Sequence, residues 1–505
     1  MVHASGGFAL VSFPSGSFID GRFTPVEHPD GLIRSVSPAD TDDVLGEFPF
    51  ARSAARQAVE AARRAQPAWA ALSMDERARA IERLRGVFAA RVDAMASALS
   101  REVGKPGWEA LSEAALLAAK VKATLEGGAR LVVPVLLPGR QAGWSYRPHG
   151  VLVVLGPFNF PAHLPNGHLV PALLLGNTVV VKPSEKTPAA GALYAELLAA
   201  ADLPPGVVNV VQGGGEVGAW LAEQAPVDGV LFTGSLAIGR AIARANADRP
   251  GKLLALELGG KNAALVLADA DLDLAAQLVA YGAYATAGQR CSSTSRVVVE
   301  QRVLPAFEEK LVEVASGLSV GHFARQDVFM GPLIGAAARD AFLAACEAGR
   351  REGATALLAP RVVSADRPGW YVSPGVHRVE RRVPGSHYQR DELFGPDVAI
   401  WPAGSEQDAI AIANDTDFGL TAALFTGDRA RFERLAPRLR AGVVNWNLPT
   451  VGANGLLPFG GVGDSGNGRP AGIFSTLYCG FPQALTWGEG APSAAPGLPW
   501  PGASR

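Results

Sequence analysis

The sequence predicts an α/β protein built on a doubly wound parallel sheet. Short runs of almost wholly apolar residues recur after residue 150, which is typical of strands buried on both faces. Segments with a helical apolar period separate these runs, so strands and helices alternate along the chain. The predicted strands are VLVVL, TVVVK, VVNVV, GVLFT and LLALEL, at residues 151–155, 178–182, 207–211, 229–233 and 253–258.

The other segments follow in chain order. Residues 52–125 are rich in Ala, Arg and Leu with a helical apolar period, and we expect three helices there, near 51–72, 75–99 and 108–126. Residues 131–150 have alternating β character between Pro and Gly and interrupt the first domain. A second α/β series runs from 263 to about 445, and residues 491–505, rich in Pro, Gly and Ser, are expected to form a loose tail.

The composition bounds the class of protein. A chain of 505 residues suits two or three domains, and 48% hydrophobic against 19% charged residues supplies large cores. The formal net charge of −2 gives no basic footprint for nucleic acid or an anionic membrane. The longest apolar stretches are strand-sized or broken by Gly and Pro, and the N-terminus lacks a charged signal-peptide region, so we expect neither a membrane span nor a signal peptide.

Cysteine and histidine usage adds two expectations. The three cysteines, at 291, 346 and 479, are odd in number and widely spaced, which fits a reducing cytoplasm and excludes a disulfide framework. The eight histidines show no ligand spacing of a metal site, so no metal is expected.

Polar side chains follow four predicted strands, and each has an ordinary alternative. Asn159 can donate its amide N–H groups to an oxyanion or form an Asx turn. Lys182 and Glu185 suit a cofactor or a charged loop before a helix. Ser235, at a strand-to-helix turn, suits a phosphate, although its surroundings are not a GxGxxG fingerprint. Glu257, before two glycines, either faces a substrate or is a solvated strand end.

Cys291 is the most unusual of the three thiols. It follows Gly288-Gln289-Arg290 and precedes two serines and a β-branched run. A lone cysteine is most often a packed apolar residue. The alternative is a nucleophile, whose base need not be adjacent in sequence.

Eight ordered motifs decide between these readings. The chain contains, in order, FNFP, KPSE, FTGS, LELGGK, GQRC, ELFGP, NWN and PFGGVGDSG. In these motifs, and over roughly residues 15–490, the chain resembles the NAD(P)-dependent aldehyde dehydrogenase superfamily. The resemblance implies an aldehyde dehydrogenase-like fold, with a Rossmann-type cofactor domain, an α/β catalytic domain and a small β arm for oligomerisation.

The resemblance also implies roles for single residues. Cys291 is expected to be the nucleophile, Glu257 the general base and Asn159 the oxyanion donor. A carboxylate at Glu185 favours NAD over NADP as the cofactor. The expected cofactor residues are Lys182, Glu185, Phe232, Gly234, Ser235, Gly239, Leu258, Glu392 and Phe394. The expected substrate residues are Ser292, Gly452, Ala453 and Phe459.

Finer motifs resemble one group within the superfamily, the N-succinylglutamate 5-semialdehyde dehydrogenases of arginine catabolism. That group shares His-Leu-Pro-Asn-Gly-His, which places His168 at a position that is usually lysine; Pro470 replaces a frequent glutamate. Both changes suggest a different proton route for deacylation. The segment CSSTSR departs from the group, so glutamate semialdehyde and general aliphatic aldehydes remain alternative substrates. A catalytically idle binding protein of the same fold is the third hypothesis.

The resemblance also predicts the limits of the domains and the oligomeric state. We expect an NAD-binding domain at 1–128 and 149–258, a catalytic domain at 259–458, and an arm at 129–148 and 474–490. The arm is expected to pair with a second copy in a homodimer or homotetramer, with a small aldehyde as the only other partner. An acidic substrate would be held by backbone N–H groups of the loop TVGANG (450–455).

Overall fold

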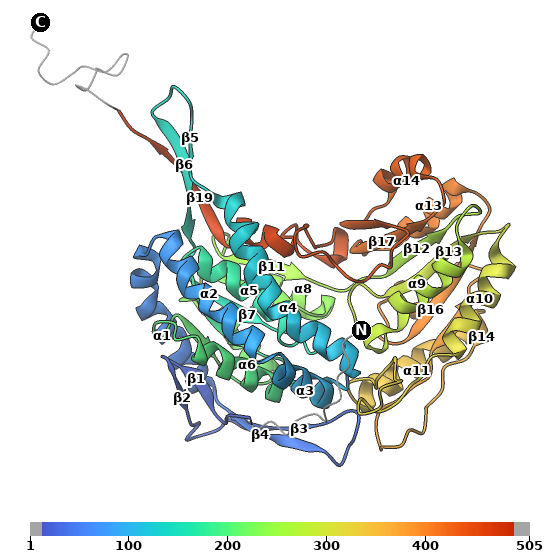
Figure 1. The fold of residues 1–505 in the computed structure, drawn as a ribbon, viewed down its shortest axis with the longest axis horizontal. Helices are drawn as coiled ribbons and strands as arrows, with labels where there is room; N and C mark the ends of the chain where they lie inside the picture. The colour runs from blue at the N-terminus through green and yellow to red at the C-terminus, as the bar shows by residue number, and fades with distance from the viewer. Residues whose placement is uncertain (1–12, 489–505) are drawn as a thin grey trace, which may run out of the picture.

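Two seven-stranded sheets, each covered by helices, form the two lobes of the protein in a computed structural model, which describes residues 13–488 (Figure 1). The chain passes from the first sheet to the second between Glu257 and Asn262. It later returns to the first lobe, where the N–H of Leu258 donates to the carbonyl of Ser465 at 3.0 Å. The predicted tail at 491–505 lies outside the described residues.

The first sheet has the order β11-β10-β7-β8-β9-β1-β2. The five strands from β11 to β9 are parallel and confirm the predicted α/β class, while β1 and β2 add an antiparallel edge. The strands are β1 Ser17–Ile19, β2 Arg22–Thr24, β7 Val151–Leu155, β8 Thr178–Lys182, β9 Val208–Val210, β10 Gly229–Thr233 and β11 Leu253–Glu257.

Helices cover both faces of this sheet because side chains alternate between its faces. Leu231 and Ala255 pack in the core with α2 to α6, whereas Phe232 and Leu256 pack in the core with α1 and α8. The helices are α1 Arg52–Ala71, α2 Met74–Ala90, α3 Val92–Val103, α4 Gly107–Glu126, α5 His163–Leu174, α6 Pro188–Ala200, α7 Gly215–Glu223 and α8 Leu236–Ala245.

The second sheet has the order β14-β15-β16-β13-β12-β17-β18 and is parallel except at β14. Its strands are β12 Asn262–Val266, β13 Thr294–Glu300, β14 Thr355–Leu358, β15 Gly375–Arg378, β16 Asp397–Ala403, β17 Thr421–Phe425 and β18 Val443–Trp446. Its helices are α9 Leu272–Tyr284, α10 Leu304–Ser316, α11 Ala336–Arg351, α12 His387–Arg390, α13 Glu406–Asn414 and α14 Arg429–Leu435.

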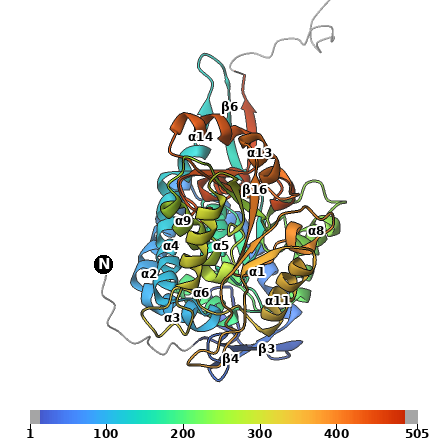
Figure 2. The ribbon, with the colours of Figure 1, turned by 90° about the vertical axis from the view of Figure 1, so that its right-hand side faces the viewer.

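A three-stranded sheet, β19-β6-β5, projects from the first lobe and stands clear of both lobes (Figures 1 and 2). It joins β5 Val135–Leu136 and β6 Ala142–Pro148 to β19 Gly480–Thr486, which pairs antiparallel with β6 from Gly480 to Thr486. A short helix, α15 Ser475–Tyr478, precedes β19. We call this sheet the arm.

The structure corrects two details. The predicted helix at 75–99 is two helices, because Arg91 has φ −120° and ψ 22° and leaves the helical region between α2 and α3. The region before residue 51 also contains strands that the sequence did not reveal, including the hairpin β3 Gly31–Val36 and β4 Val44–Phe50. The two strands of this hairpin have six and seven residues, but most of their side chains are exposed or half-exposed, so they carry little apolar signal.

Candidate active site

Cys291 follows a short 3-10 turn, Ala285–Gly288, at the end of α9. Thr286 and Ala287 have φ of 56° and 51°, in the left-handed region, which costs about 1–2 kcal/mol for each residue with a side chain. The Nδ2 of Asn262, on the second sheet, donates to the carbonyl of Cys291 at 2.7 Å. The loop that presents the thiol is therefore strained and held in place, as is typical of a functional site.

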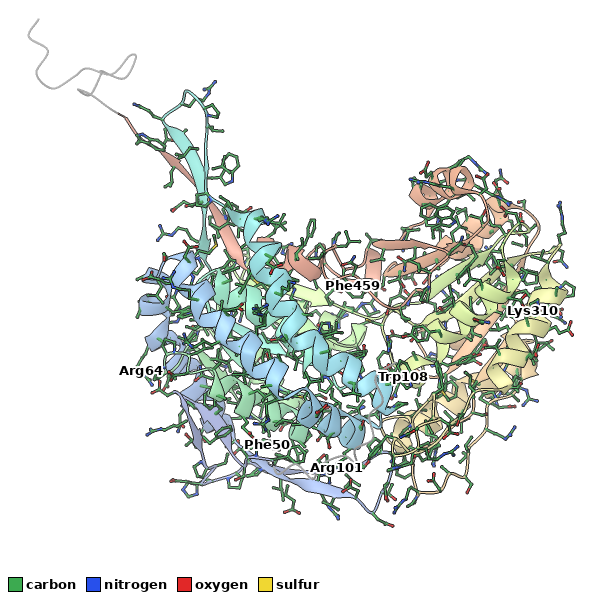
Figure 3. All side chains as sticks on the ribbon, in the orientation of Figure 1. Phe50, Arg64, Arg101, Trp108, Lys310 and Phe459 are labelled. Carbon is green, nitrogen blue, oxygen red and sulfur yellow. The ribbon has the colours of Figure 1, made fainter. Side chains whose placement is uncertain are left out.

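A buried ion pair holds this loop to α4. The carboxylate of Glu109 accepts the N–H of Thr286 at 3.1 Å and the Nη2 of Arg290 at 2.6 Å. Burial opposes ionisation of this carboxyl, but the charges of Arg290 and Lys105 outweigh it and lower the pKa of Glu109. Trp108, the neighbour of Glu109, lies where α4 reaches the second lobe (Figure 3).

The electrostatics of Cys291 favour the neutral thiol. Burial, and then the negative charges of Glu392 and Glu257, raise the pKa of Cys291 to about 12. The thiolate is the reactive form of cysteine, so the proton has to leave when the thiol attacks. The two carboxylates that raise this pKa are also the nearby groups able to accept a proton.

Asn159 comes from the loop after β7 and contacts the same segment. Its Nδ2 donates to the carbonyl of Gln289 at 2.8 Å, and its Oδ1 accepts the N–H of Phe160 at 3.1 Å. An asparagine amide has two N–H groups, and Gln289 takes one of them. The other can donate to an oxygen that develops negative charge beside Cys291.

Glu257 ends β11 and is only 6% exposed. Its Oε2 has no hydrogen-bond partner within the described part of the chain. Burial raises the pKa of Glu257 well above its usual range. A buried carboxyl with a raised pKa is suited to accept a proton during a reaction.

A cleft runs from Cys291 across the carboxyl ends of the first sheet, where ligands bind in doubly wound folds. Of the nine predicted cofactor residues, all except Gly239 line it. Gly239 instead packs against Leu258, where a Cβ would lie 2.5 Å from a leucine methyl. The Nζ of Lys182 lies 3.5 Å from Glu185, and Ser235 caps α8 through the N–H of Ile238.

Glu392 and Phe394 reach the cleft from the second lobe. The Oε1 of Glu392 accepts the N–H of Gly260 at 3.0 Å, and a Cβ on Gly259 would lie 2.2 Å from its other oxygen. A side chain at position 259 would therefore displace the carboxylate of Glu392 from its place against the backbone. Phe394 meets Phe158 edge-on, with ring centroids 5.7 Å apart.

Part of the cleft was not predicted. Small and aliphatic residues of α7 and α8 line the part of the cleft beyond Glu185 and give it an apolar wall, which we call the apolar slot. These residues are Gly215, Gly218, Ala219, Ala222, Ile238, Ala241, Ile242 and Ala245. Their spacing of three and four residues puts them on one face of each helix, which is the signal that the sequence offered.

Unlike the predicted cofactor residues, the predicted substrate residues do not line this cleft. The Ser292 side chain is buried, and its carbonyl accepts the hydroxyl of Thr450 at 2.7 Å. Gly452 has φ 87° and open space around it, and Ala453 is exposed. Phe459 lies between the two lobes (Figure 3).

Residues 13–488 contain neither a candidate metal site nor a candidate membrane-spanning helix. No group of three or more His, Cys, Asp or Glu side chains there is arranged to hold a metal ion. No helix of this part is both long enough and apolar enough to cross a membrane.

The comparisons with known proteins define the class. Residues 25–479 match the model of the aldehyde dehydrogenase family, and the chain belongs to that family. It is 42% identical over 474 residues to an N-succinylglutamate 5-semialdehyde dehydrogenase of Caulobacter sp. (strain K31), covering 93% of this chain and 96% of the relative.

Solved structures agree with this assignment. An NAD-dependent aldehyde dehydrogenase from Sinorhizobium meliloti is 31% identical with a TM-score of 0.90, covering 96% of this chain and 97% of that one. Aldehyde dehydrogenase C from Pseudomonas syringae, a mutant in complex with NAD+ and octanal, is 30% identical with a TM-score of 0.88, covering 94% and 96%.

Proposed function

We propose that this protein oxidises N-succinyl-L-glutamate 5-semialdehyde to N-succinyl-L-glutamate with NAD+, through a thioester on Cys291. One observation carries the chemistry: Cys291, Asn159 and Glu392 line one cleft, and Glu257 lies close enough to act on the pKa of the thiol. The substrate rests on the relatives of that name, which are about 40% identical over most of their length. The chain also carries His-Leu-Pro-Asn-Gly-His at 163–168, one of the segments in which it resembles that group.

Each step of the proposed reaction is assigned to particular residues. A neighbouring carboxylate, Glu257 or Glu392, takes the thiol proton of Cys291 as the sulfur forms a bond to the aldehyde carbon. Asn159 with the N–H of Cys291 stabilises the resulting oxyanion. When bound, NAD+ would supply the acceptor for the aldehyde hydride, and removal of that hydride leaves the carbon attached to Cys291 as a thioester. Glu257 then takes one proton from water as the water oxygen bonds to the thioester carbon. The C–S bond breaks, the sulfur of Cys291 takes the second water proton, and the product leaves as a carboxylate.

The cleft fits NAD. The apolar slot of α7 and α8 suits the adenine ring, and the carboxylate of Glu185 suits the ribose hydroxyls that a 2′-phosphate would replace. Lys182 lies beside Glu185, and Ser235 with the N-terminus of α8 suits a pyrophosphate. Glu392 and Phe394 are assigned to the nicotinamide ribose and ring.

A second substrate class has its own support. The Pseudomonas relative was solved with octanal, a neutral aliphatic aldehyde. Free glutamate semialdehyde is a further alternative. For an acidic substrate, Ser292, Gly452, Ala453 and Phe459 are assigned to the substrate side, where the loop 450–455 offers backbone N–H groups to a carboxylate.

The arm supports a proposed homodimer or homotetramer. The arm exposes four large hydrophobic side chains, those of Leu136, Trp144, Phe481 and Leu485. Exposed side chains of this kind gather where a partner covers them. The three free cysteines suit a cytoplasmic location. The domain limits proposed are 1–128 with 149–258 for NAD, 259–458 for catalysis, and 129–148 with 474–490 for the arm.

An NADH absorbance assay with three aldehydes tests this function. The succinylated semialdehyde should be oxidised with a far higher kcat/KM than glutamate semialdehyde or octanal. Cys291→Ala should abolish oxidation while NAD+ still binds, and Glu257→Gln should give one turnover of NADH and then stall. Preference for octanal in the parent enzyme would overturn the acidic-substrate assignment, and steady turnover by the glutamine variant would overturn the role of Glu257.

A further inference from the structure

Cys291 is the second residue of a tight turn, residues 290–293. The N–H of Ser293 donates to the carbonyl of Arg290 at 3.0 Å and closes the turn. A trans peptide group is planar, so the N–H of Cys291 points away from the carbonyl of Arg290. The hydrogen bond that closes the turn therefore fixes the direction of the N–H that is proposed to stabilise the oxyanion.

The side-chain amide of Asn262 holds the same turn at two points. Its Nδ2 donates to the carbonyl of Cys291 at 2.7 Å and to the carbonyl of Ser293 at 2.9 Å. Its Oδ1 accepts the N–H of Thr421 at 3.0 Å. The two N–H groups of this amide thus have two acceptors, and its oxygen has a separate donor, so the amide has one preferred orientation.

The place of Asn262 in the second sheet explains how one side chain can hold the turn. Asn262 is 3% exposed and begins β12, which lies between β13 and β17. The strand β13 begins at Thr294, directly after the turn, and β17 begins at Thr421. The amide therefore connects the turn to the first residues of neighbouring strands, and the second sheet sets the position of the turn.

Gly260 leaves room for this contact. A Cβ at position 260 would lie 2.7 Å from the Oδ1 and 2.8 Å from the Nδ2 of Asn262, and closer still to the carbonyl oxygen of Cys291. Cβ atoms do not approach other atoms so closely, so a side chain at this position would push the amide and the turn apart.

The N–H groups of the turn lie beside the sulfur. Burial and the charges of Glu392 and Glu257 raise the pKa of Cys291 to about 12, while the backbone N–H groups of Ser292 and Cys291 act in the opposite direction. These N–H groups are therefore close to the sulfur. An oxygen on a carbon bonded to that sulfur would lie near them as well.

We propose that Asn262 is a positioning residue for the nucleophile, which holds the turn 290–293 so that the N–H of Cys291 points at the oxyanion. This inference rests on the proposed function, because it concerns the oxyanion that forms when Cys291 attacks a carbonyl carbon. Asn262 does not line the cleft and acts through the backbone of the turn. A misplacement of about 1 Å at a reacting centre can lower a rate about 100-fold.

The test compares two reactions of the Cys291 thiol. Iodoacetamide alkylates the thiolate by a displacement that forms no oxyanion. p-Nitrophenyl acetate acylates the same thiolate through a tetrahedral oxyanion, and the first p-nitrophenolate released reports this step. Both rates depend on the fraction of thiolate, so their ratio at one pH isolates the stabilisation of the oxyanion. The rates of Cys291→Ala are subtracted as background.

Two variants and a matched control are compared. Asn262→Ala removes the amide, and Asn262→Ser is a milder variant that keeps a hydroxyl. Asn177→Ala is the control, because Asn177 is also a buried amide and lies in the first lobe. Its Nδ2 donates to the carbonyls of Ala172 and Cys479, at 3.0 Å and 2.7 Å, and its Oδ1 accepts two backbone N–H groups. The unfolding midpoint in urea and the NAD+ affinity are measured for each variant.

We expect Asn262→Ala to lower the ratio of acylation to alkylation at least tenfold, with an alkylation rate within threefold of the parent. Asn262→Ser should lie between Asn262→Ala and the parent. Asn177→Ala should lose stability in urea and keep the parent ratio. Three results would overturn the proposal, since each would make the role of Asn262 merely structural: a ratio within twofold of the parent in both Asn262 variants, an equal fall of the ratio in Asn177→Ala, or failure of both Asn262 variants to fold.

The outcome does not depend on which aldehyde is the substrate. If the parent forms no NADH with any aldehyde, the proposed oxidation fails, while the ester and iodoacetamide still measure the role of Asn262. If the parent oxidises aldehydes and both Asn262 variants keep the parent ratio, the positioning role alone fails.

Discussion

Replacement of Asn159 with alanine should reduce catalysis far more than it reduces stability. The Asn159 amide donates to the carbonyl of Gln289 and accepts from the N–H of Phe160. Its remaining N–H is the proposed donor to the oxyanion. Removing one oxyanion donor costs about 2.7–4 kcal/mol in the transition state, which lowers kcat about 100- to 1000-fold.

Asn159→Ala should lose less free energy of unfolding than it loses in transition-state stabilisation. The two hydrogen bonds that Asn159 makes contribute about 1 kcal/mol each to the free energy of unfolding. Asn166→Ala is a matched control, because Asn166 is also buried, donates to the carbonyl of Leu117 and accepts from Tyr194, each at 3.1 Å. It should lose similar stability and keep most of its kcat.

The assay follows the first turnover of NADH by stopped flow and the unfolding midpoint in urea. Asn159→Ala should slow the first turnover about 100-fold or more and leave NAD+ affinity unchanged. If its first turnover stays within threefold of the parent, or if Asn166→Ala loses as much activity, Asn159 is a structural residue and the oxyanion assignment is wrong.

Three further predictions follow from the structure. Because the pKa of Cys291 is raised to about 12, its alkylation by iodoacetamide should accelerate about tenfold per pH unit between about pH 7 and about pH 11. Glu392→Gln should speed the alkylation, since it removes a negative charge near the thiol. Mass spectrometry measures the alkylated fraction. Phe481→Asp with Leu485→Asp should yield monomer in light scattering, since both side chains are exposed on the arm; ending the chain at Ile473 should do the same or cause aggregation. An unchanged oligomer from the double aspartate variant would refute the arm interface. Gly452→Val should raise KM for an acidic semialdehyde far more than for octanal, whereas equal losses on both would remove the anion-binding role of that loop.

The Gly452→Val prediction needs a control for backbone strain. Gly452 has φ 87°, where valine is strained whatever the space around it. Gly385 has φ 76° and equally open surroundings in the second lobe. Gly385→Val should therefore show the strain on stability without the change in KM.

The sequence predicted the five parallel strands of the first sheet because they are buried on both faces and read as uninterrupted apolar runs, but it missed the two antiparallel edge strands β1 and β2. It also predicted where polar groups would gather, since parallel strands end at the same edge. It failed at Arg91, where no Gly or Pro marks the break between α2 and α3 and the apolar period continues across it. Gly239 was assigned to the cofactor because it lies in a motif, whereas its contact is with Leu258.

The buried ring of His168 shows where prediction from sequence ends, because its nitrogens lie 3.2 Å from the hydroxyl of Thr233 and 3.0 Å from the hydroxyl of Tyr478. Thr233 and Glu257 both end five-residue strands, so their shared face follows from the alternation of side chains along parallel strands. Tyr478 is 310 residues from His168, and no periodicity connects them. The pairing exists because the C-terminal segment returns to the first lobe, where Tyr478 packs in the same core as α5 before β19 joins the arm.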